Sequence, residues 1–104
     1  MRDEMTELTG HEVLDETGGK IGKIADVIYS TDTAEPAYVR LDFGLLKSHH
    51  VLVPLEDAYR SDHGDLVVPF DKNTVKGAPK VPTPVALTKP LEEQLDLYYA
   101  GARA

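Results

Sequence analysis

The chain has 104 residues, a length typical of one domain, with 41% hydrophobic residues, 28% charged residues and a net charge of −7. This composition is too apolar for a disordered acidic tail, and no stretch approaches the roughly 18 apolar residues of a membrane helix. The lack of cysteine excludes disulfides, a thiolate nucleophile and cysteine-ligated metals. The first ten residues contain no apolar stretch typical of a secretory signal. We therefore expect a cytoplasmic protein with no membrane span and a single domain over residues 1–104.

The charge is unevenly distributed along the chain. Residues 1–35 contain nine acids and three bases, whereas residues 71–104 contain four acids and five bases. Nucleic-acid binding normally requires a basic surface that displaces counterions from phosphates. The acidic balance therefore argues against nucleic acid as a partner, and it predicts that a partner attracted by charge meets the N-terminal third.

The first predicted elements form a hairpin. Glu12–Asp15 is a short strand candidate, and the following Gly18 and Gly19 can adopt the positive φ angles of a tight turn. The apolar residues of the next segment match a helical spacing at Ile21, Ile24, Ala25 and Ile28. Its many β-branched residues and the internal Gly22 instead favour a strand with a bulge near that glycine. We therefore predict a strand over residues 20–30.

The strongest strand pattern follows a polar turn at residues 31–36. One predicted face contains Ala37, Val39, Leu41 and Phe43, and the other contains Tyr38, Arg40 and Asp42. This alternation predicts that the first set is buried and that the second set is exposed to water. The loop after it, residues 44–48, contains two adjacent leucines.

Two further pieces complete the expected sheet. His49–Pro54 is a strand that the proline ends or marks as an edge. Residues 57–61 and 65–69 flank Gly64 and predict another hairpin. Five or six short strands without a long intervening helix indicate an all-β fold, either an antiparallel barrel or a small sandwich.

The last third of the chain differs from the rest in composition and in predicted structure. Residues 71–76 predict one helical turn capped by Asp71, and four of the seven prolines fall within residues 77–90. We expect this proline-rich segment to form a semi-rigid strap. A C-terminal helix is predicted over residues 89–100, with Thr88 as its cap and Gly101 at its end. Its apolar stripe contains Leu91, Leu95, Tyr98 and Tyr99. This stripe could pack on the chain's own barrel or on a partner.

Three stretches, GGKIGKIADVIYSTDTAEPAYVRLDFG, HHVLVPLEDAY and DLVVPFDKNTVKGAPKV, together resemble the PRC-barrel domain family. The resemblance spans about residues 8–83, and the C-terminal helix is similar to one in stand-alone bacterial members. It implies a small, strongly bent antiparallel β-barrel of about six strands, here over about residues 8–76. The family includes the cytoplasmic part of the photosynthetic reaction-centre H subunit and the second domain of the ribosome-maturation factor RimM. Their shared theme is docking onto other proteins, and the resemblance implies no catalytic residues.

The histidines are the candidate metal ligands. His49 and His50 are adjacent and would point to opposite faces of a strand, so they would not bind one ion together. One of them could combine with His63 and with Asp62 or Asp65 if the two strands met. Nothing in the spacing requires such a site. We expect no metal and no cofactor, and keep a metal-binding or small-ligand protein as an alternative hypothesis.

Exposed apolar residues suggest a docking surface. The interface candidates are Leu45, Leu46, Tyr98 and Tyr99, because loop residues and tyrosines are common in interfaces. The alternative is that both leucines close one end of the barrel and that the tyrosines belong to the core. We therefore predict a non-enzymatic protein-interaction or adaptor module that binds a partner protein or a second copy. An accessory role in RNA processing or ribosome assembly, by analogy with RimM, is a further alternative.

Overall fold

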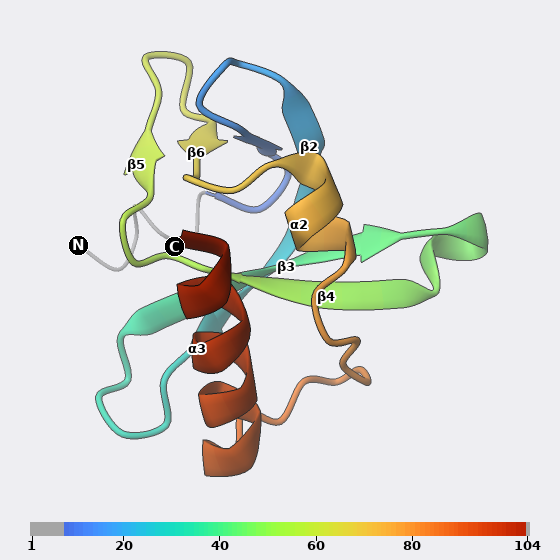
Figure 1. The fold of residues 1–104 in the computed structure, drawn as a ribbon, viewed down its shortest axis with the longest axis vertical. Coiled ribbons are helices and arrows are strands. Elements are labelled where there is room, and N and C mark those ends of the chain that lie inside the picture. The colour runs from blue at the N-terminus through green and yellow to red at the C-terminus, as the bar shows by residue number, and fades with distance from the viewer. Residues whose placement is uncertain (1–7, 104) are drawn as a thin grey trace.

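The computed structural model describes residues 8–103, and six strands and two α-helices make up most of it (Figure 1). The strands are β1 (Glu12–Leu14), β2 (Lys20–Tyr29), β3 (Pro36–Phe43), β4 (His49–Pro54), β5 (Tyr59–Arg60) and β6 (Leu66–Val67). The helical elements are η1 (Leu45–Lys47), α2 (Lys72–Lys76) and α3 (Lys89–Arg103). The expectation that the first ten residues contain no secretory signal falls mainly on residues outside the described range. Within residues 8–103, no helix combines the length and the hydropathy needed to cross a bilayer.

The strands form one sheet in the order β4-β3-β2-β1-β6-β5. The predicted purely antiparallel arrangement is wrong at one position, because β1 and β6 pair in parallel while all other neighbours are antiparallel. This parallel pair arises because the chain passes through β2, β3, β4 and β5 before it returns to the free edge of β1. The observed architecture is therefore a mainly antiparallel, β-rich fold with a C-terminal helix.

The pairing of the long strand β2 is irregular at three points. The register shifts once opposite Val13 and Leu14 of β1, and opposite β3 it shifts between Ile24 and Asp26 and between Ile28 and Tyr29. The first shift confirms the bulge predicted near Gly22. Each extra residue moves the buried face by one position, so the buried side chains of β2 recur every third residue, at Ile21, Ile24 and Val27. This displacement explains why a strand resembled a helix in sequence.

The outer face of β3, predicted to be exposed, is partly covered at Arg40 and Asp42 and buried at Tyr38. This residue was expected to be exposed, but only 6% of its surface is accessible. Its hydroxyl lies 3.3 Å from Oδ1 of Asp96 on α3 and donates a hydrogen bond to it. Burial, followed by the nearby Asp96 carboxylate, raises the pKa of Tyr38. The prediction failed because the strand pattern contains no information about a helix that returns to cover this end of the sheet.

The edge strand β4 is covered by later parts of the chain. The backbone N–H of Val81, in the proline-rich segment, donates to the carbonyl of His50 at 2.9 Å. The hydroxyl of Tyr99 donates to the carbonyl of Leu52 at 2.8 Å. Exposed strand edges invite pairing with other chains. The strap and α3 therefore leave less of this edge available for strand addition.

Helix α3 continues past its predicted end. Gly101 was expected to terminate it, but the helix runs to Arg103. A terminating glycine normally adopts a positive φ, and Gly101 is not among the glycines that do so. At the other end, Thr88 accepts a hydrogen bond from the backbone N–H of Leu91 through its side chain, at 3.3 Å. The predicted N-terminal cap is confirmed.

The predicted cap of α2 is also confirmed, and it gives a first testable prediction. The side chain of Asp71 accepts a 2.8 Å hydrogen bond from the backbone N–H of Thr74. Asp71→Ala should lower the free energy of unfolding by about 1 kcal/mol because this N–H loses its partner. Asp71→Asn, which keeps a capping oxygen, should change it by less than half as much. Urea denaturation of both variants measures the difference, and equal losses would contradict the capping role.

Candidate docking surface

The β3–β4 hairpin ends in a short turn with an unusual backbone. Gly44 has a φ of 86°, and a β-carbon at this position would lie 2.9 Å from Cδ2 of His49, so only glycine fits without distortion. Leu46 and Lys47 follow with φ angles of 58° and 53°, in the left-handed region that non-glycine residues rarely adopt. The hydroxyl of Ser48 donates to the carbonyl of Leu45 at 3.0 Å and braces the turn. The turn is therefore locally strained but held in place by hydrogen bonds.

This turn presents two leucines to solvent. Leu45 is 86% exposed and Leu46 is 91% exposed. Neither residue closes an end of the sheet, so the alternative in which they fill the core is wrong. Exposed large apolar side chains on a strained turn are common at functional positions. We call residues 45–47 the leucine tip.

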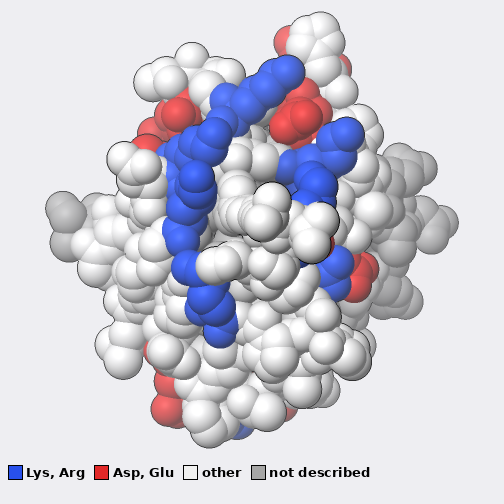
Figure 2. Space-filling view, turned by 90° about the vertical axis from the view of Figure 1, so that its right-hand side faces the viewer, with Lys and Arg blue, Asp and Glu red and all other residues white. Residues whose placement is uncertain are grey.

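Lysines lie beside the leucine tip. Figure 2 faces the side from which the hairpin extends, and it shows Lys and Arg side chains in two bands with uncharged surface between them. Nζ of Lys76 on α2 lies 5.6 Å from the ring centre of Phe43 at the base of the tip, within range of a cation–π interaction. Lys80 is next to it, with Nζ donating to the carbonyl of Lys76 at 3.0 Å. We call the exposed side chains of Lys72, Lys76 and Lys80 the lysine rim.

The charge of the lysine rim is not neutralised locally. Among residues 8–103, the ion pairs involve other groups, and no rim lysine pairs with an acid. The chain as a whole carries a net charge of −7, so this face departs from the average of the molecule. Sequence composition missed this arrangement because Lys76 lies near Phe43, at the base of the leucine tip, only when α2 packs beside β4.

The two predicted interface tyrosines contact their own chain instead. Tyr99 is 1% exposed, and its ring centre lies 4.7 Å from that of Phe70. Burial raises the pKa of its hydroxyl. Tyr98 is half-buried, and its hydroxyl donates to the carbonyl of Thr74 at 2.7 Å. In this structure the stripe of α3 packs on the chain's own sheet, and the tyrosines offer little surface to a partner.

His50 belongs to an ion-pair network on β3 and β4. Its Nδ1 lies 2.7 Å from Oδ1 of Asp42. Arg40 also contacts both carboxylate oxygens of Asp42, through Nε at 3.0 Å and Nη2 at 3.2 Å. Burial raises the pKa of Asp42, but the hydrogen bonds from His50 and Arg40 outweigh it and lower the pKa overall. The adjacent His49 points to solvent, as expected for neighbouring strand residues.

Removal of the central carboxylate should weaken the fold in a pH-dependent way. The Asp42 side chain is only 15% exposed, so Asp42→Asn should lower the free energy of unfolding at pH 7 by about 1–2 kcal/mol. Because the folded-state pKa is lowered from 3.8, this contribution is present above that value and is lost as pH falls through the folded pKa. The difference between variant and wild type should therefore be largest at pH 7 and should shrink at a pH below 3.8. Urea denaturation at both pH values, with the exposed Asp62→Asn as control, measures it; a gap independent of pH would contradict the assignment.

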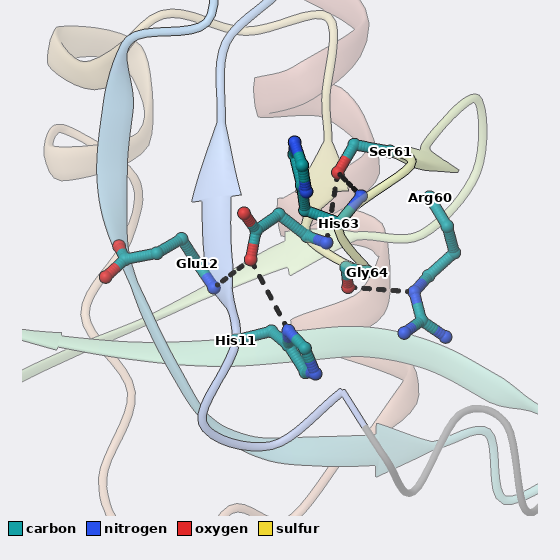
Figure 3. Close-up of polar contacts among 7 residues, drawn as sticks. His11, Glu12, Arg60, Ser61, His63 and Gly64 are labelled. Atoms are coloured by element: carbon teal, nitrogen blue, oxygen red, sulfur yellow. Dashed lines mark hydrogen bonds and ion pairs between the residues drawn. The ribbon is translucent and has the colours of Figure 1, made fainter.

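A second polar cluster joins β1 to the β5–β6 hairpin (Figure 3). The backbone N–H of Glu12 donates to Oδ1 of Asp65 at 3.1 Å, and Nδ1 of His11 lies 3.4 Å from the same oxygen. The hydrogen bond from Glu12, which is the largest influence, lowers the pKa of Asp65. The backbone N–H of His63 donates to the Ser61 hydroxyl at 3.3 Å, and the His63 side chain acts on Asp65 electrostatically. These contacts join β1 to the β5–β6 hairpin.

The structure does not assemble the alternative metal site. Within residues 8–103, no three His, Cys, Asp or Glu side chains lie close enough together to hold an ion. His50 lies on β4, at one end of the strand order, and His63 lies in the turn between β5 and β6, at the other end. Zinc sites in proteins use three or four such ligands. The histidine hypothesis therefore gains no support from the geometry.

The glycine-rich turn after β1 is not arranged for phosphate binding. Oδ1 of Asp15 accepts hydrogen bonds from the backbone N–H groups of Thr17 at 2.9 Å and Gly19 at 2.8 Å. A hydrogen bond from the Thr17 hydroxyl, followed by that from Gly19, lowers the pKa of this carboxyl. A phosphate-binding loop needs such donors free for its ligand. Here they stabilise the predicted hairpin turn.

The bent, mainly antiparallel sheet defines a small β-rich domain, and the turn between β3 and β4 exposes two leucines. A family model of the PRC-barrel domain matches residues 2–75. The chain therefore belongs to the PRC-barrel domain family, and the resemblance seen in its sequence is confirmed. No curated protein matches the chain.

Proposed function

We propose that this PRC-barrel chain is a non-catalytic interaction module that docks on a partner protein, or on a second copy of itself, through the leucine tip. The observation that carries the proposal is the exposure of Leu45 and Leu46, at 86% and 91%, on a turn held by its own hydrogen bonds. Removing apolar surface from water is favourable by about 25 cal/mol per Å². Burial of the two leucines would therefore contribute to binding. A partner supplies that burial.

The polar clusters support the proposal that the module is not catalytic. Asp15, Asp42, Asp65 and Asp71 all accept hydrogen bonds from neighbouring groups of the fold. General acid–base catalysis needs a group with a perturbed pKa near neutrality facing a substrate cleft. The pKa of each of these carboxyls is lowered instead. Their role is to hold turns and strands.

Partner capture with a matched variant tests the proposal. Wild-type protein and Leu45→Ser/Leu46→Ser serve as baits in native lysate, with Tyr59→Ser as control because Tyr59 is exposed (58%) outside the tip. We expect one partner, or the chain itself, to be crosslinked by wild type and the control but lost with the tip variant. Circular dichroism establishes that all three baits are folded. Identical crosslinks from all three baits, or none from a folded wild-type bait, would refute docking through the tip.

A further inference from the structure

A second exposed apolar position lies on α3. Leu97 is 76% exposed, whereas Leu95 and Tyr99 of the same helix are buried against the sheet. Glu93 is four residues before Leu97 and therefore shares its face of the helix. Asp96, three residues after Glu93, is exposed at the border between this face and the sheet, where it accepts the hydrogen bond from Tyr38. We call Glu93, Asp96 and Leu97 the outer α3 face.

The outer α3 face and the leucine tip are complementary in both charge and polarity. The tip combines two exposed leucines with the lysine rim, whereas the outer face combines an exposed leucine with two carboxylates. The four large hydrophobic side chains exposed within residues 8–103 are Leu45, Leu46, Tyr59 and Leu97. Three of the four belong to these two surfaces. In Figure 1 the β3–β4 hairpin extends to the right and α3 runs down the lower centre, so the two surfaces lie on different sides of the molecule.

We infer that the partner of the leucine tip is a second copy of this chain, bound head to tail. Leu45 and Leu46 of one copy contact Leu97 of the next, while the lysine rim lies opposite Glu93 and Asp96. The inference rests on the proposed function and names its partner. Because the contact joins two different surfaces, a pair of copies keeps one free outer face on the first copy and one free tip on the second, and such heterologous contacts produce rings or open chains.

A second copy accounts for more of the structure than an anionic lipid surface does. A bilayer would pair with the leucines and the lysines but would leave exposed Leu97 and its acidic neighbours unexplained. Complementary charges also make the association sensitive to salt, because screening shortens from about 8 Å at 0.15 M to about 3 Å at 1 M ionic strength. A single contact, between the lysines of one copy and the carboxylates of the next, therefore gives both surfaces a role.

The decisive experiment mixes two variants that each lack one surface. The tip variant is Leu46→Ser/Lys76→Glu, and the outer-face variant is Glu93→Lys/Leu97→Ser; all four positions are exposed, so both should fold. Sedimentation velocity should show concentration-dependent association of wild type that weakens about tenfold between 0.15 M and 1 M NaCl. Each variant alone should be monomeric. Their equimolar mixture should form a 1:1 heterodimer and nothing larger, because only one complementary contact remains.

The control is Tyr59→Ser/Asp62→Lys, which has the same kinds of change at exposed positions outside both surfaces and should associate like wild type. Two monomeric variants that stay monomeric when mixed would overturn the head-to-tail contact. A monomeric wild type would overturn it as well. If that monomer still captures another protein through the leucine tip, the proposed function survives without this partner. If it instead binds vesicles of phosphatidylglycerol but not phosphatidylcholine, the tip belongs to a lipid surface and both proposals fail.

Discussion

Tyr99→Ala is expected to lower the free energy of unfolding by about 3–5 kcal/mol, the largest loss of any single substitution considered. The side chain is 1% exposed, packs on Phe70 and donates to the Leu52 carbonyl of the edge strand. Its truncation removes apolar contacts, leaves a cavity and frees a buried carbonyl. The total free energy of unfolding of a domain of this size is about 5–15 kcal/mol. The variant should therefore be only marginally folded, which a urea titration followed by circular dichroism measures.

Two further variants separate the loss of the hydrogen bond from the loss of buried packing. Tyr99→Phe keeps the ring but removes the donor to Leu52, so it should lose about 1–2 kcal/mol. Leu97→Ala, on the same helix but 76% exposed, should change stability by less than about 0.5 kcal/mol. A small effect of Tyr99→Ala, equal to that of Leu97→Ala, would show that α3 does not pack on the sheet in solution.

The sequence was informative at several positions where structure depends on near neighbours along the chain, although the predicted helix end at Gly101 was wrong. The Gly18 turn, the Asp71 cap and the bulge near Gly22 were all predicted, because each follows from local backbone preferences. The parallel β1–β6 pair and the burial of Tyr38 were not. Both depend on contacts between residues more than fifty positions apart, which a periodicity within one strand does not encode. The family resemblance predicted the β-rich fold, which the structure shows as a mainly antiparallel six-stranded sheet with a C-terminal helix.

The candidate docking surface was predicted only in part. Exposure of Leu45 and Leu46 was one of two open alternatives, because an apolar loop can equally cover a core. Tyr98 and Tyr99 belong to the packed face of α3, as a stripe spaced at i, i+3 and i+4 usually does. The lysine rim was missed because its members lie after β6 in sequence and meet the leucine tip only in space. No local pattern brings Lys76 to Phe43.

Leu46→Asn should have opposite effects on stability and docking. Leu46 has a φ of 58°. This left-handed conformation costs about 1–2 kcal/mol for residues other than Gly, Asn and Asp. Asparagine tolerates this conformation, and the leucine side chain is 91% exposed and contributes little packing. The free energy of unfolding should therefore rise by about 0.5–1 kcal/mol, while the affinity for the partner falls about tenfold because the apolar contact is lost.

The opposite signs make this substitution more informative than a damaging one. Weaker binding by a protein that has become more stable has to come from the lost contact, because unfolding is excluded as its cause. Urea denaturation gives the stability, and sedimentation or crosslinking gives the association. Leu45→Asn is the matched control, because Leu45 has no positive φ and should lose affinity without gaining stability. If Leu46→Asn gained stability and bound as tightly as wild type, the strained leucine would have no docking role. The docking proposal accounts for the positive φ of Leu46 and for the exposure of its side chain together.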